Sequence, residues 1–294
     1  MLTRRHVIKG LLGTFLAGLF AATYGFFIEP ALRFRVRRWT VRHADWPMDK
    51  PLKVAVVADL HMGDPYVPLA RLERIVARTN ALGADLIVIL GDLTAGHRFV
   101  TGTIPPGDTA AVLARLSAPL GVCAVLGNHD WWDDPQAQKR KRGPVETGIA
   151  LERHGIPVLE NQAIELPNGI WVAGLGDQLA LVQGRGRYTG VDDLPATLDQ
   201  VPDGAPAILL AHEPDIFPKV PDRIPLTLSG HTHGGQVRLF GWSPIVPSRF
   251  GNRFAYGHVQ EGTRHLVVSG GIGSSIMPVR FGVVPEITLV TLTA

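Results

Sequence analysis

The fold is decided by the stretch Val122-Cys123-Ala124-Val125-Leu126-Gly127-Asn128-His129-Asp130. An apolar run of strand length ends in a glycine, and three polar side chains of different chemistry follow it at once. Hydrophobic periodicity alone does not require this combination. It is typical of a reaction centre at the carboxyl end of a buried parallel strand.

The same pattern, an apolar run that ends in metal-ligating residues, occurs four more times. The runs and the residues that follow them are 54–58 with Asp59 and His61, 86–90 with Asp92, 207–211 with His212, and 226–229 with His231 and His233. Residues two apart in an extended chain share a face, so Asp59 and His61 can hold one ion together. Five apolar runs that end this way predict one metal-binding reaction centre.

Composition sets the class of protein. A chain of 294 residues with 46% hydrophobic residues can build one large α/β or α+β domain. The formal charge of +3 suits an anionic substrate or membrane surface, and it is too small to indicate nucleic acid by itself. No long stripe of interleaved basic and aromatic residues favours a nucleic-acid partner either. The single cysteine, Cys123, excludes an intrachain disulfide and is interpreted as a core residue.

Residues 1–30 are interpreted as a signal or anchor segment, and residues 31–294 as a single catalytic domain. A basic start is followed by an apolar stretch over residues 10–28, close to the roughly 20 residues that span a bilayer. The pair Arg4-Arg5 with Lys9 resembles a twin-arginine export signal, although Val7 stands where Phe is usual. An ordinary signal anchor with a coincidental arginine pair is the alternative. No clear cleavage site is visible around Ala21-Ala22, which favours a retained N-terminal helix.

The predicted location is the bacterial inner membrane, with one N-terminal anchor. Export would place the catalytic domain outside the cytoplasm, and a cytoplasm-facing domain is the alternative. Arginines also follow the apolar stretch, at positions 33, 35, 37 and 38, so the positive-inside rule does not decide the orientation.

The order of elements predicts an α+β fold. Strands are expected at 34–43, 54–58, 86–90, 122–126, 157–160, 163–166, 170–174, 206–211, 225–229, 265–269 and 287–292, and helices at 68–82, 109–116, 145–154 and 194–198. Asn168-Gly169 between two apolar runs indicates a hairpin, and residues 176–193 are expected to form a polar loop. We expect two packed mixed β-sheets with helices on their outer faces.

The candidate ligands contain two carboxylates, four imidazoles and one amide oxygen. They are Asp59, His61, Asp92, Asn128, His212, His231 and His233. One ion cannot use seven such ligands, and a structural zinc site would favour cysteine. Nitrogen and oxygen ligands without thiolate suit Mn, Fe, Zn or Co. With one shared carboxylate the set supplies two ions with four ligands each, and ions about 3.5–4 Å apart promote in-line displacement at phosphorus.

The motif series from Asp59-x-His61 to Gly230-His231-x-His233 resembles the calcineurin-like metallophosphoesterase superfamily over about residues 52–292. Ser229 to Gln236 and the tail from Gly271 to Ile287 are similar to its bacterial membrane-associated phosphodiesterase branch, the YaeI- and YkuE-like proteins. The resemblance implies an αββα four-layer sandwich with a dinuclear metal centre. It also implies that Asp59, His61 and His233 hold one metal, that Asn128, His212 and His231 hold the other, and that Asp92 bridges them.

The implied function is a dinuclear metal-dependent phosphoesterase, acting on phosphodiesters or pyrophosphates in preference to monoesters. A metal-bridging hydroxide would attack phosphorus in line. His129 lies outside the ligand set and is the candidate catalytic residue, which stabilises the transition state or protonates the leaving oxygen, with Asp130 fixing its orientation.

Two further stretches are candidates for substrate binding. The aromatic loop over residues 239–256 contains Arg249 and Arg253, and is either core packing or an apolar groove with arginines for the phosphate of a lipid-linked substrate. The basic run over residues 139–142 is either a solvated loop or a basic lip for phosphates or anionic headgroups.

Three other functions are alternatives. One is a pyrophosphatase of lipid A synthesis that acts on UDP-2,3-diacylglucosamine, whose substrate at the cytoplasmic face conflicts with export. The second is a membrane-anchored binding protein with an inactive site, against which the complete ligand set argues. The third is a dinuclear hydrolase of amides or lactones, in which a His-x-His motif would come early; here Asp59-x-His61 comes first and His231-x-His233 last.

Overall fold

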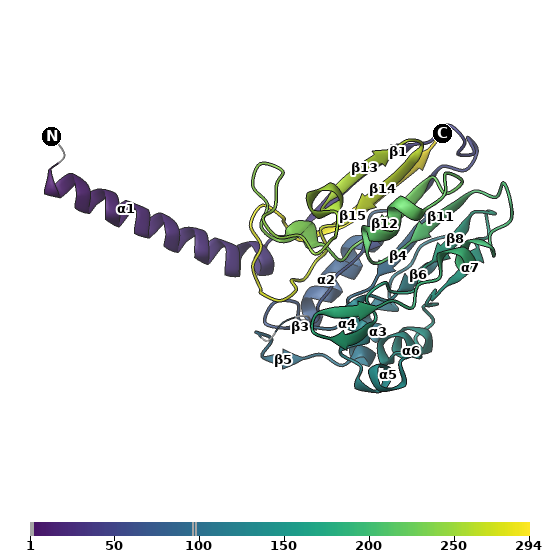
Figure 1. Ribbon diagram of the computed structural model, residues 1–294, viewed down its shortest axis with the longest axis horizontal. Coiled ribbons are helices and arrows are strands. Elements are labelled where there is room, and N and C mark those ends of the chain that lie inside the picture. The colour runs from purple at the N-terminus through teal and green to yellow at the C-terminus, as the bar shows by residue number, and fades with distance from the viewer. Residues whose placement is uncertain (1–2, 96, 98) are drawn as a thin grey trace.

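Two mixed β-sheets pack face to face in the computed structural model, which describes residues 3–95, 97 and 99–294 (Figure 1). The first sheet has the order β1-β15-β2-β4-β6 and the second the order β13-β14-β12-β11-β8-β7. The strands of the first sheet are β1 (Arg35–Arg42), β2 (Leu52–Val57), β4 (Leu86–Leu90), β6 (Val122–Val125) and β15 (Glu286–Thr293). Those of the second are β7 (Gln162–Glu165), β8 (Trp171–Gly174), β11 (Ala207–Leu210), β12 (Leu226–Ser229), β13 (Gly257–Glu261) and β14 (Arg264–Val268).

Within each sheet, the strands that precede the polar motifs run parallel to one another, although β2 is antiparallel to its other neighbour, β15. In the first sheet β2 pairs with β4, and β4 with β6; in the second β11 pairs with β12. Their residues are nearly all apolar because both faces of each sheet are covered. Val56 and Val88 of the first sheet and Ile208 and Leu210 of the second belong to one buried cluster between the sheets. This packing holds the carboxyl ends of the five strands at one edge of the sandwich.

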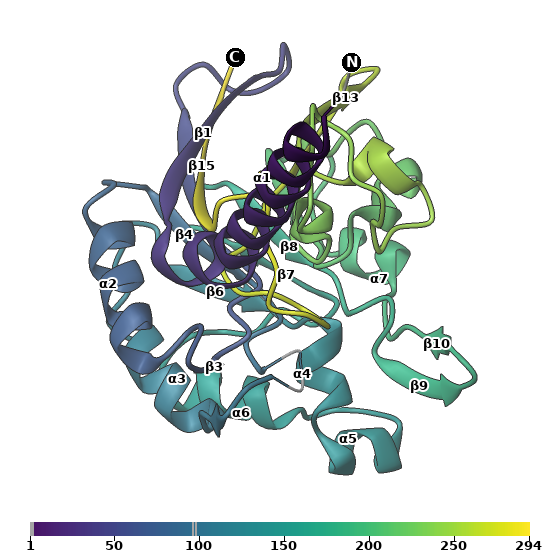
Figure 2. The ribbon, with the colours of Figure 1, turned by 90° about the vertical axis from the view of Figure 1, so that its left-hand side faces the viewer.

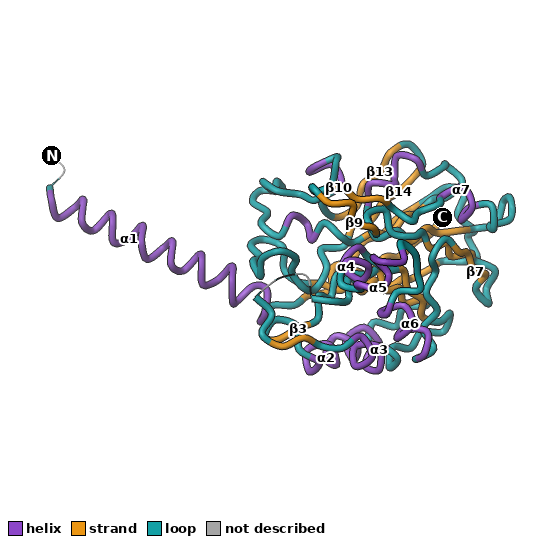
Figure 3. Tube along the Cα trace, turned by 60° about the horizontal axis from the view of Figure 1, so that its bottom comes forward, coloured by secondary structure: helices purple, strands orange, loops and turns teal. Residues whose placement is uncertain are grey.

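Helices cover the outer faces and complete four layers. On the first sheet lie α2 (Leu69–Asn80), α3 (Pro106–Leu113) and α6 (Glu146–Arg153), and on the second lie α7 (Leu194–Leu198) and the 3-10 helix η2 (Pro214–Lys219). Buried Leu72 and Leu113 lie in the core under the first group, and Leu198 and Ile216 in the core under the second. Figure 3 shows α2, α3 and α6 side by side along one side of the strands. The predicted αββα sandwich is confirmed.

A long helix leaves the domain at its N-terminal end. It is made of α1 (Arg4–Thr23), none of whose residues is buried, and the π-helical turns of η1 (Tyr24–Leu32), which bury Gly25, Glu29 and Pro30. In the described part of the chain, Arg4–Leu32 is the one helix long and apolar enough to cross a membrane; a signal sequence passes the same test. Figure 2 views the face from which this helix projects.

Several elements differ from the expectations. The loop predicted over 176–193 contains the hairpin β9 (Leu181–Gly184) and β10 (Arg187–Thr189), and β13 was not predicted. Helix α3 begins at Pro106, and the strand expected at 157–160 is reduced to one bridge between Ala124 and Val158. Most hairpin residues are exposed, so β9 and β10 show no hydrophobic alternation. The remaining elements are β3 (Gly63–Asp64), β5 (Gly102–Thr103), α4 (Asn128–Trp132), α5 (Pro135–Arg140), η3 (His233–Gly235) and η4 (Gly251–Phe254).

Two glycines let the ends of β4 and β6 approach closely. A Cβ at Gly91 would overlap the backbone of Gly127, and a Cβ at Gly127 would overlap the Asp92 carboxylate and the His212 ring. Gly91 also has a φ of +80°, in the region that favours glycine. The polar residues that follow these strands can meet only because neither position carries a side chain.

Substitution of Gly91 tests this close approach. Gly83 is the matched control, because it also has a positive φ, +58°, but no atom lies within 4 Å of its Cβ position. We expect Gly83→Ala to lower the free energy of unfolding by about 1–2 kcal/mol, the cost of a left-handed alanine. Gly91→Ala should lower it clearly further, because the overlap adds to that cost. Urea denaturation of both variants measures the difference. Equal losses of unfolding free energy would show that the close approach of β4 and β6 at Gly91 is unimportant for stability.

Candidate metal centre

All seven predicted ligands lie together at the carboxyl ends of β2, β4, β6, β11 and β12. Each is buried, with His231 the most exposed at 8%. Two groups of ligand atoms within 4.8 Å of one another contain six of them: Asp59, His61, Asp92 and His233, and Asp92, His212 and His231. Asn128 joins the second group through a 2.8 Å contact between its Oδ1 and His231 Nδ1. Asp92 belongs to both groups.

The backbone at this site is strained. Five of the seven residues have positive φ angles: Asp59 (52°), His61 (44°), Asp92 (55°), His231 (68°) and His233 (50°). Residues other than glycine rarely adopt such angles, and each costs on the order of 1–3 kcal/mol. Backbone hydrogen bonds between neighbouring loops hold the conformation, such as Asp59 N–H to Gly91 O (3.1 Å) and His61 N–H to Asp92 O (3.0 Å). Strain concentrated in ligating residues marks a functional site.

In the first group, the Nε2 atoms of two histidine rings face each other. His61 Nδ1 lies 3.0 Å from the Thr94 carbonyl and therefore donates to it, which leaves His61 Nε2 bare. That Nε2 lies 3.0 Å from His233 Nε2 and 3.5 Å from Asp92 Oδ2. Asp59 Oδ2 is buried without a hydrogen-bond partner among the described residues. Because Arg280 donates to His233 Nδ1, the neutral His233 ring carries its proton at Nε2 and donates it to His61 Nε2. A cation bound between these atoms would take the place of that proton and would also satisfy Asp59 Oδ2.

The second group repeats this arrangement. His212 Nδ1 lies 2.5 Å from the Leu90 carbonyl and donates to it, so its bare Nε2 faces Asp92 Oδ2 at 3.3 Å. Two acceptors at this distance need a proton or a metal ion between them. Burial lowers the pKa of His212, but the charge of Asp92 outweighs burial and raises it well above its ordinary value. A bound cation would replace that proton.

Burial controls the charge of the other ligands. It lowers the pKa of His61 to about 3 and that of His233 well below its ordinary value, so both rings are neutral and able to ligate. Burial also raises the pKa of Asp59 to about 7. For Asp92 burial acts in the same direction, but the charges of His212 and His129 outweigh it and hold its pKa well below its usual range. A buried, ionised Asp92 calls for positive charge nearby.

The donor set fits a divalent metal. It offers imidazole nitrogens and carboxylate or amide oxygens, and the described residues bring no thiolate to it, since Cys123 lies in the core between the sheets. Such mixed ligands suit Mn, Fe, Zn or Co. The clusters of Asp and His therefore indicate that this edge of the sandwich binds divalent metal.

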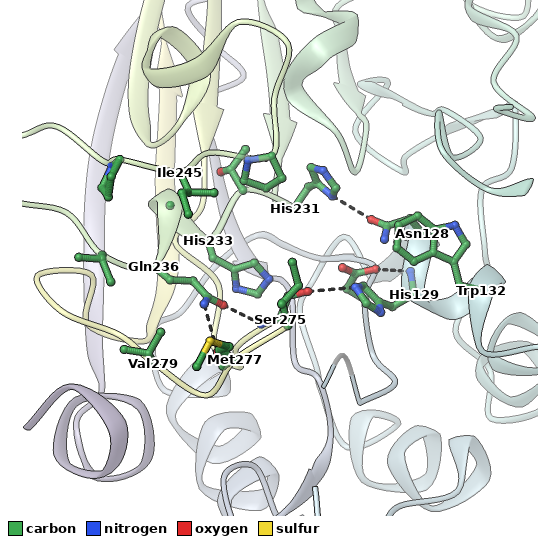
Figure 4. Close-up of a pocket in the computed structure, with 17 residues that line it drawn as sticks. Asn128, His129, Trp132, His231, His233, Gln236, Ile245, Ser275, Met277 and Val279 are labelled. Atoms are coloured by element: carbon green, nitrogen blue, oxygen red, sulfur yellow. Dashed lines mark hydrogen bonds between the residues drawn. The ribbon is translucent and has the colours of Figure 1, made fainter. Parts of the chain in front are cut away.

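A cleft of about 320 Å³ opens beside the ligands (Figure 4). His129 lines it, and its ring Nε2 lies 3.0 Å from Ser275 Oγ. The backbone N–H of His129 donates to Asp92 Oδ1 at 2.8 Å, which fixes this residue against the shared carboxylate. Figure 4 shows His129 and Trp132 on one side of the cleft, and Ile245, Met277 and Val279 on the other. The predicted catalytic histidine thus faces a cleft that leads to the metal ligands.

The expected role of Asp130 needs correction. Its carboxylate accepts backbone N–H groups of Asp92 (2.9 Å), Leu93 (3.0 Å) and Gly127 (2.9 Å). The hydrogen bond recorded for the His129 ring goes to Ser275 instead. Asp130 therefore shapes the loops that present Asp92 and Asn128, and Ser275 orients the ring. The local pattern His129-Asp130 could not show this, because both partners come from other loops.

The two predicted substrate arginines also lie elsewhere. Arg249 pairs with Asp215 at 3.2 Å and Arg253 with Glu261 at 2.6 Å, and neither lines the cleft. The aromatic loop does contribute to the cleft, but through apolar residues. The basic run at 139–142 ends α5 and is largely exposed, and none of its residues lines the cleft. This favours the interpretation of that run as a solvated loop.

Sequence reasoning missed Arg280. Its guanidinium is fully buried, donates to His233 Nδ1 at 3.1 Å, and also donates to the carbonyls of Gly270 (2.8 Å) and Gly273 (2.9 Å). It therefore fixes the orientation of a ligand ring. Nothing periodic surrounds it in the sequence, and its distance of 47 residues from His233 gives no local signal.

Two buried carboxyl groups behind His212 were missed as well. Asp177 and Glu213 form a third group with His212. Burial, and then the charge of Glu213, raise the pKa of Asp177 well above its ordinary value. The pair therefore holds a proton and contributes less negative charge beside His212 than two ionised carboxylates would.

Comparisons with known proteins agree with this geometry. The family described as "Calcineurin-like phosphoesterase" matches residues 52–235. The chain is 32% identical to "Uncharacterized metallophosphoesterase YkuE" of Bacillus subtilis over 99% of this chain and 98% of that protein. It is 29% identical to an "Uncharacterized metallophosphoesterase" of Aquifex aeolicus over 88% and 91% of the two chains. A bovine "Transmembrane protein with metallophosphoesterase domain" is 30% identical over 84% of this chain and 54% of its own length. The resemblance found in the sequence is confirmed.

Metal binding should stabilise the fold. Because the ligands come from loops of both sheets, an ion that binds only the folded state adds about 2.7 kcal/mol at a hundredfold excess over its Kd. We expect chelator treatment to lower the melting temperature and Mn²⁺ or Zn²⁺ to restore it. Asp92→Ala should abolish the metal-dependent shift, whereas Asp203→Ala, an exposed turn residue, should keep it. A shift that survives in Asp92→Ala would place the ion elsewhere.

Proposed function

The chain belongs to the calcineurin-like metallophosphoesterase family, and from this premise we propose that it is a dinuclear metal-dependent phosphodiesterase or pyrophosphatase. The observation that carries the proposal is the pair of buried ligand groups that share Asp92. A cleft with His129 in its wall opens directly beside them. A binding protein with a decayed site would not retain this complete set.

We assign the ligands to two ions on the basis of these groups. Asp59, His61 and His233 would hold one, Asn128, His212 and His231 the other, with Asp92 between them. Bound divalent ions in such a pair supply Lewis acidity for phosphoryl oxygens and an activated water.

The protein's own residues then orient the substrate and move a proton. In hydrolysis the oxygen of water bonds to phosphorus, the bond from phosphorus to the leaving oxygen breaks, and the leaving oxygen takes up a proton. His129 faces the cleft and can hold that proton at Nε2. Ser275 Oγ orients the ring, and the Thr94 hydroxyl donates to the His129 carbonyl at 3.1 Å. Both contacts limit the positions from which the proton is delivered.

The charge of the cleft supports a diester substrate. A phosphomonoester carries nearly two negative charges at neutral pH and is commonly recognised by arginine or lysine. Among the described residues, none that lines the cleft is an arginine or a lysine. A diester or substituted pyrophosphate, with one charge on each phosphorus, suits such a lining better.

The apolar helix Arg4–Leu32 and the relatives named as transmembrane proteins point weakly to membrane anchoring. We propose that the helix anchors the chain in a bacterial inner membrane. The arginine pair at positions 4 and 5 supports twin-arginine export and a catalytic domain outside the cytoplasm.

The reaction class is tested with two chromogenic esters. The full chain in detergent is stripped of metal and refilled with Mn, Fe, Zn or Co, and hydrolysis of bis(p-nitrophenyl) phosphate is compared with that of p-nitrophenyl phosphate. We expect metal-dependent hydrolysis with preference for the diester. Failure to cleave either ester with metal bound would contradict the proposal and favour a binding role.

The role of His129 is tested by His129→Ala. Because the ring lies outside both ligand groups, metal content should stay unchanged while turnover of the diester falls by about 10²–10⁴-fold. The control is His154→Ala, since this ring bonds the Ala150 carbonyl at the end of α6, away from the cleft. Metal loss in His129→Ala, measured by elemental analysis, would refute the assigned role.

A further inference from the structure

Large apolar side chains stand exposed beside the cleft, on two loops. The first loop presents Leu239, Phe240 and Trp242, and the second presents Ile276; Phe240 is fully exposed and Ile276 is 76% exposed. We call these four residues the apolar rim. Contiguous apolar surface of this kind commonly marks an interaction site.

The two loops form one surface because they are bonded to each other. The side-chain oxygen of Gln236 accepts a hydrogen bond from the backbone N–H of Ser275 at 2.7 Å, and its side-chain nitrogen donates one to the Met277 carbonyl at 3.1 Å. The backbone of Arg238 donates to Phe281 O at 2.8 Å, just before the first tip. The rim is therefore one fixed patch.

Both tips hold bulky residues in a strained conformation. Phe240 has a φ of +51° and Ile276 a φ of +63°. Phe240 and Gly241 form the centre of a tight turn closed by two 2.9 Å backbone bonds between Leu239 and Trp242. Such angles are costly for an aromatic or β-branched residue, and neither side chain buries itself in the domain. The stabilising contact for these side chains is expected outside the chain.

The N-terminal helix identifies that contact. The Gly25 carbonyl accepts the Arg280 backbone N–H at 2.8 Å, and the Tyr24 ring meets the Phe281 ring edge-on at 5.6 Å. The candidate span Arg4–Leu32 thus leaves the domain against the second rim loop. Figure 1 shows the helix and the loops of both rim segments on the same side of the domain. The rim therefore lies on the side of the domain that would face a bilayer holding the helix.

The cleft connects the rim to the ligands. Its lining combines the candidate ligands Asp92, Asn128, His231 and His233 with the apolar residues Val237, Ile245, Ile276, Met277 and Val279. Figure 4 shows Asn128 and His129 across the opening from Ile245 and Val279, with His231 and His233 between them. A lining that combines metal ligands with apolar residues matches an amphiphile with a phosphate and an acyl chain.

We propose that the apolar rim sits in the surface of the bilayer beside the N-terminal helix, and that the cleft takes an acyl-bearing phosphodiester or pyrophosphate from this bilayer. The phosphate reaches the ligands while the start of the acyl chain lies between Ile245 and Met277. Trp242 suits this position, because tryptophan favours the membrane interface. The part of the proposal that concerns the substrate rests on the proposed function. The part that places the rim in the bilayer surface, here called seating, does not.

Seating is measured without catalysis. The full chain is placed in phosphatidylethanolamine and phosphatidylglycerol vesicles that contain a lipid brominated on its acyl chain. The contribution of Trp242 is obtained by subtracting the tryptophan fluorescence of Trp242→Phe from that of the wild type. We expect the brominated lipid to quench this difference. If the brominated lipid does not quench Trp242 fluorescence, or if quenching occurs only when a second copy of the chain binds, the rim does not sit in the bilayer surface as proposed.

Two esters with the same leaving group test the substrate class. One is bis(p-nitrophenyl) phosphate in solution, and the other is the p-nitrophenyl ester of phosphatidic acid in the vesicles. In Phe240→Ser/Trp242→Ser we expect kcat/KM for the acylated ester to fall on the order of tenfold or more, which corresponds to the loss of one large buried apolar side chain. Hydrolysis of the soluble diester should not change, because neither residue lines the cleft.

Met48→Ser is the matched control, because Met48 is 87% exposed and lies beyond the far end of β1. It should leave both rates unchanged. Equal use of the two esters by the wild type would overturn the substrate half even if Trp242 is quenched. If neither ester is cleaved while Trp242 is quenched, the proposed function fails and the seating stands.

Discussion

The structure depends on one buried carboxylate, that of Asp92, which must stay ionised between two groups of ligands. It is 1% exposed, and both His61 Nε2 and His212 Nε2 point at its Oδ2. A charge in such a place is costly unless it is matched by opposite charge and hydrogen bonds. Much of the surrounding fold serves this requirement: two sheets bring five strand ends to one edge, and Gly91 and Gly127 let β4 and β6 come close.

The clustering of the candidate ligands could be predicted from the sequence because their signal is local. Each follows an apolar strand, so a hydrophobic run, a turn and a polar residue were enough to find Asp59 or His212 without knowledge of the fold. The order of strands and helices also predicted the two sheets and their outer helices. The positions of Ser275 and Arg280 could not be predicted, since they lie in an irregular tail and act on residues of distant strands.

The wrong expectations have the same physical origin. Asp130 stands next to His129 in the chain, but a short helix start directs its carboxylate to the backbone of neighbouring loops. Arg249 and Arg253 lie among aromatic residues, yet Asp215 and Glu261 neutralise them at the surface. Most of the hairpin of β9 and β10 lies outside the core, with Leu181 as the buried exception, and Trp132 stacks on its Tyr188 at 4.7 Å. Such contacts depend on tertiary structure, which cannot be predicted from neighbouring residues in the sequence.

Arg280 connects the N-terminal helix to the candidate metal centre, since its backbone N–H donates to the Gly25 carbonyl and its guanidinium donates to His233. Asp92 is proposed to bridge two ions. Anomalous diffraction from crystals of the Mn-loaded protein tests it most directly. The account predicts two peaks about 3.5–4 Å apart, one beside His61 and the other beside His212, with Asp92 between them. A single peak, or a pair that Asp92 does not join, would contradict it.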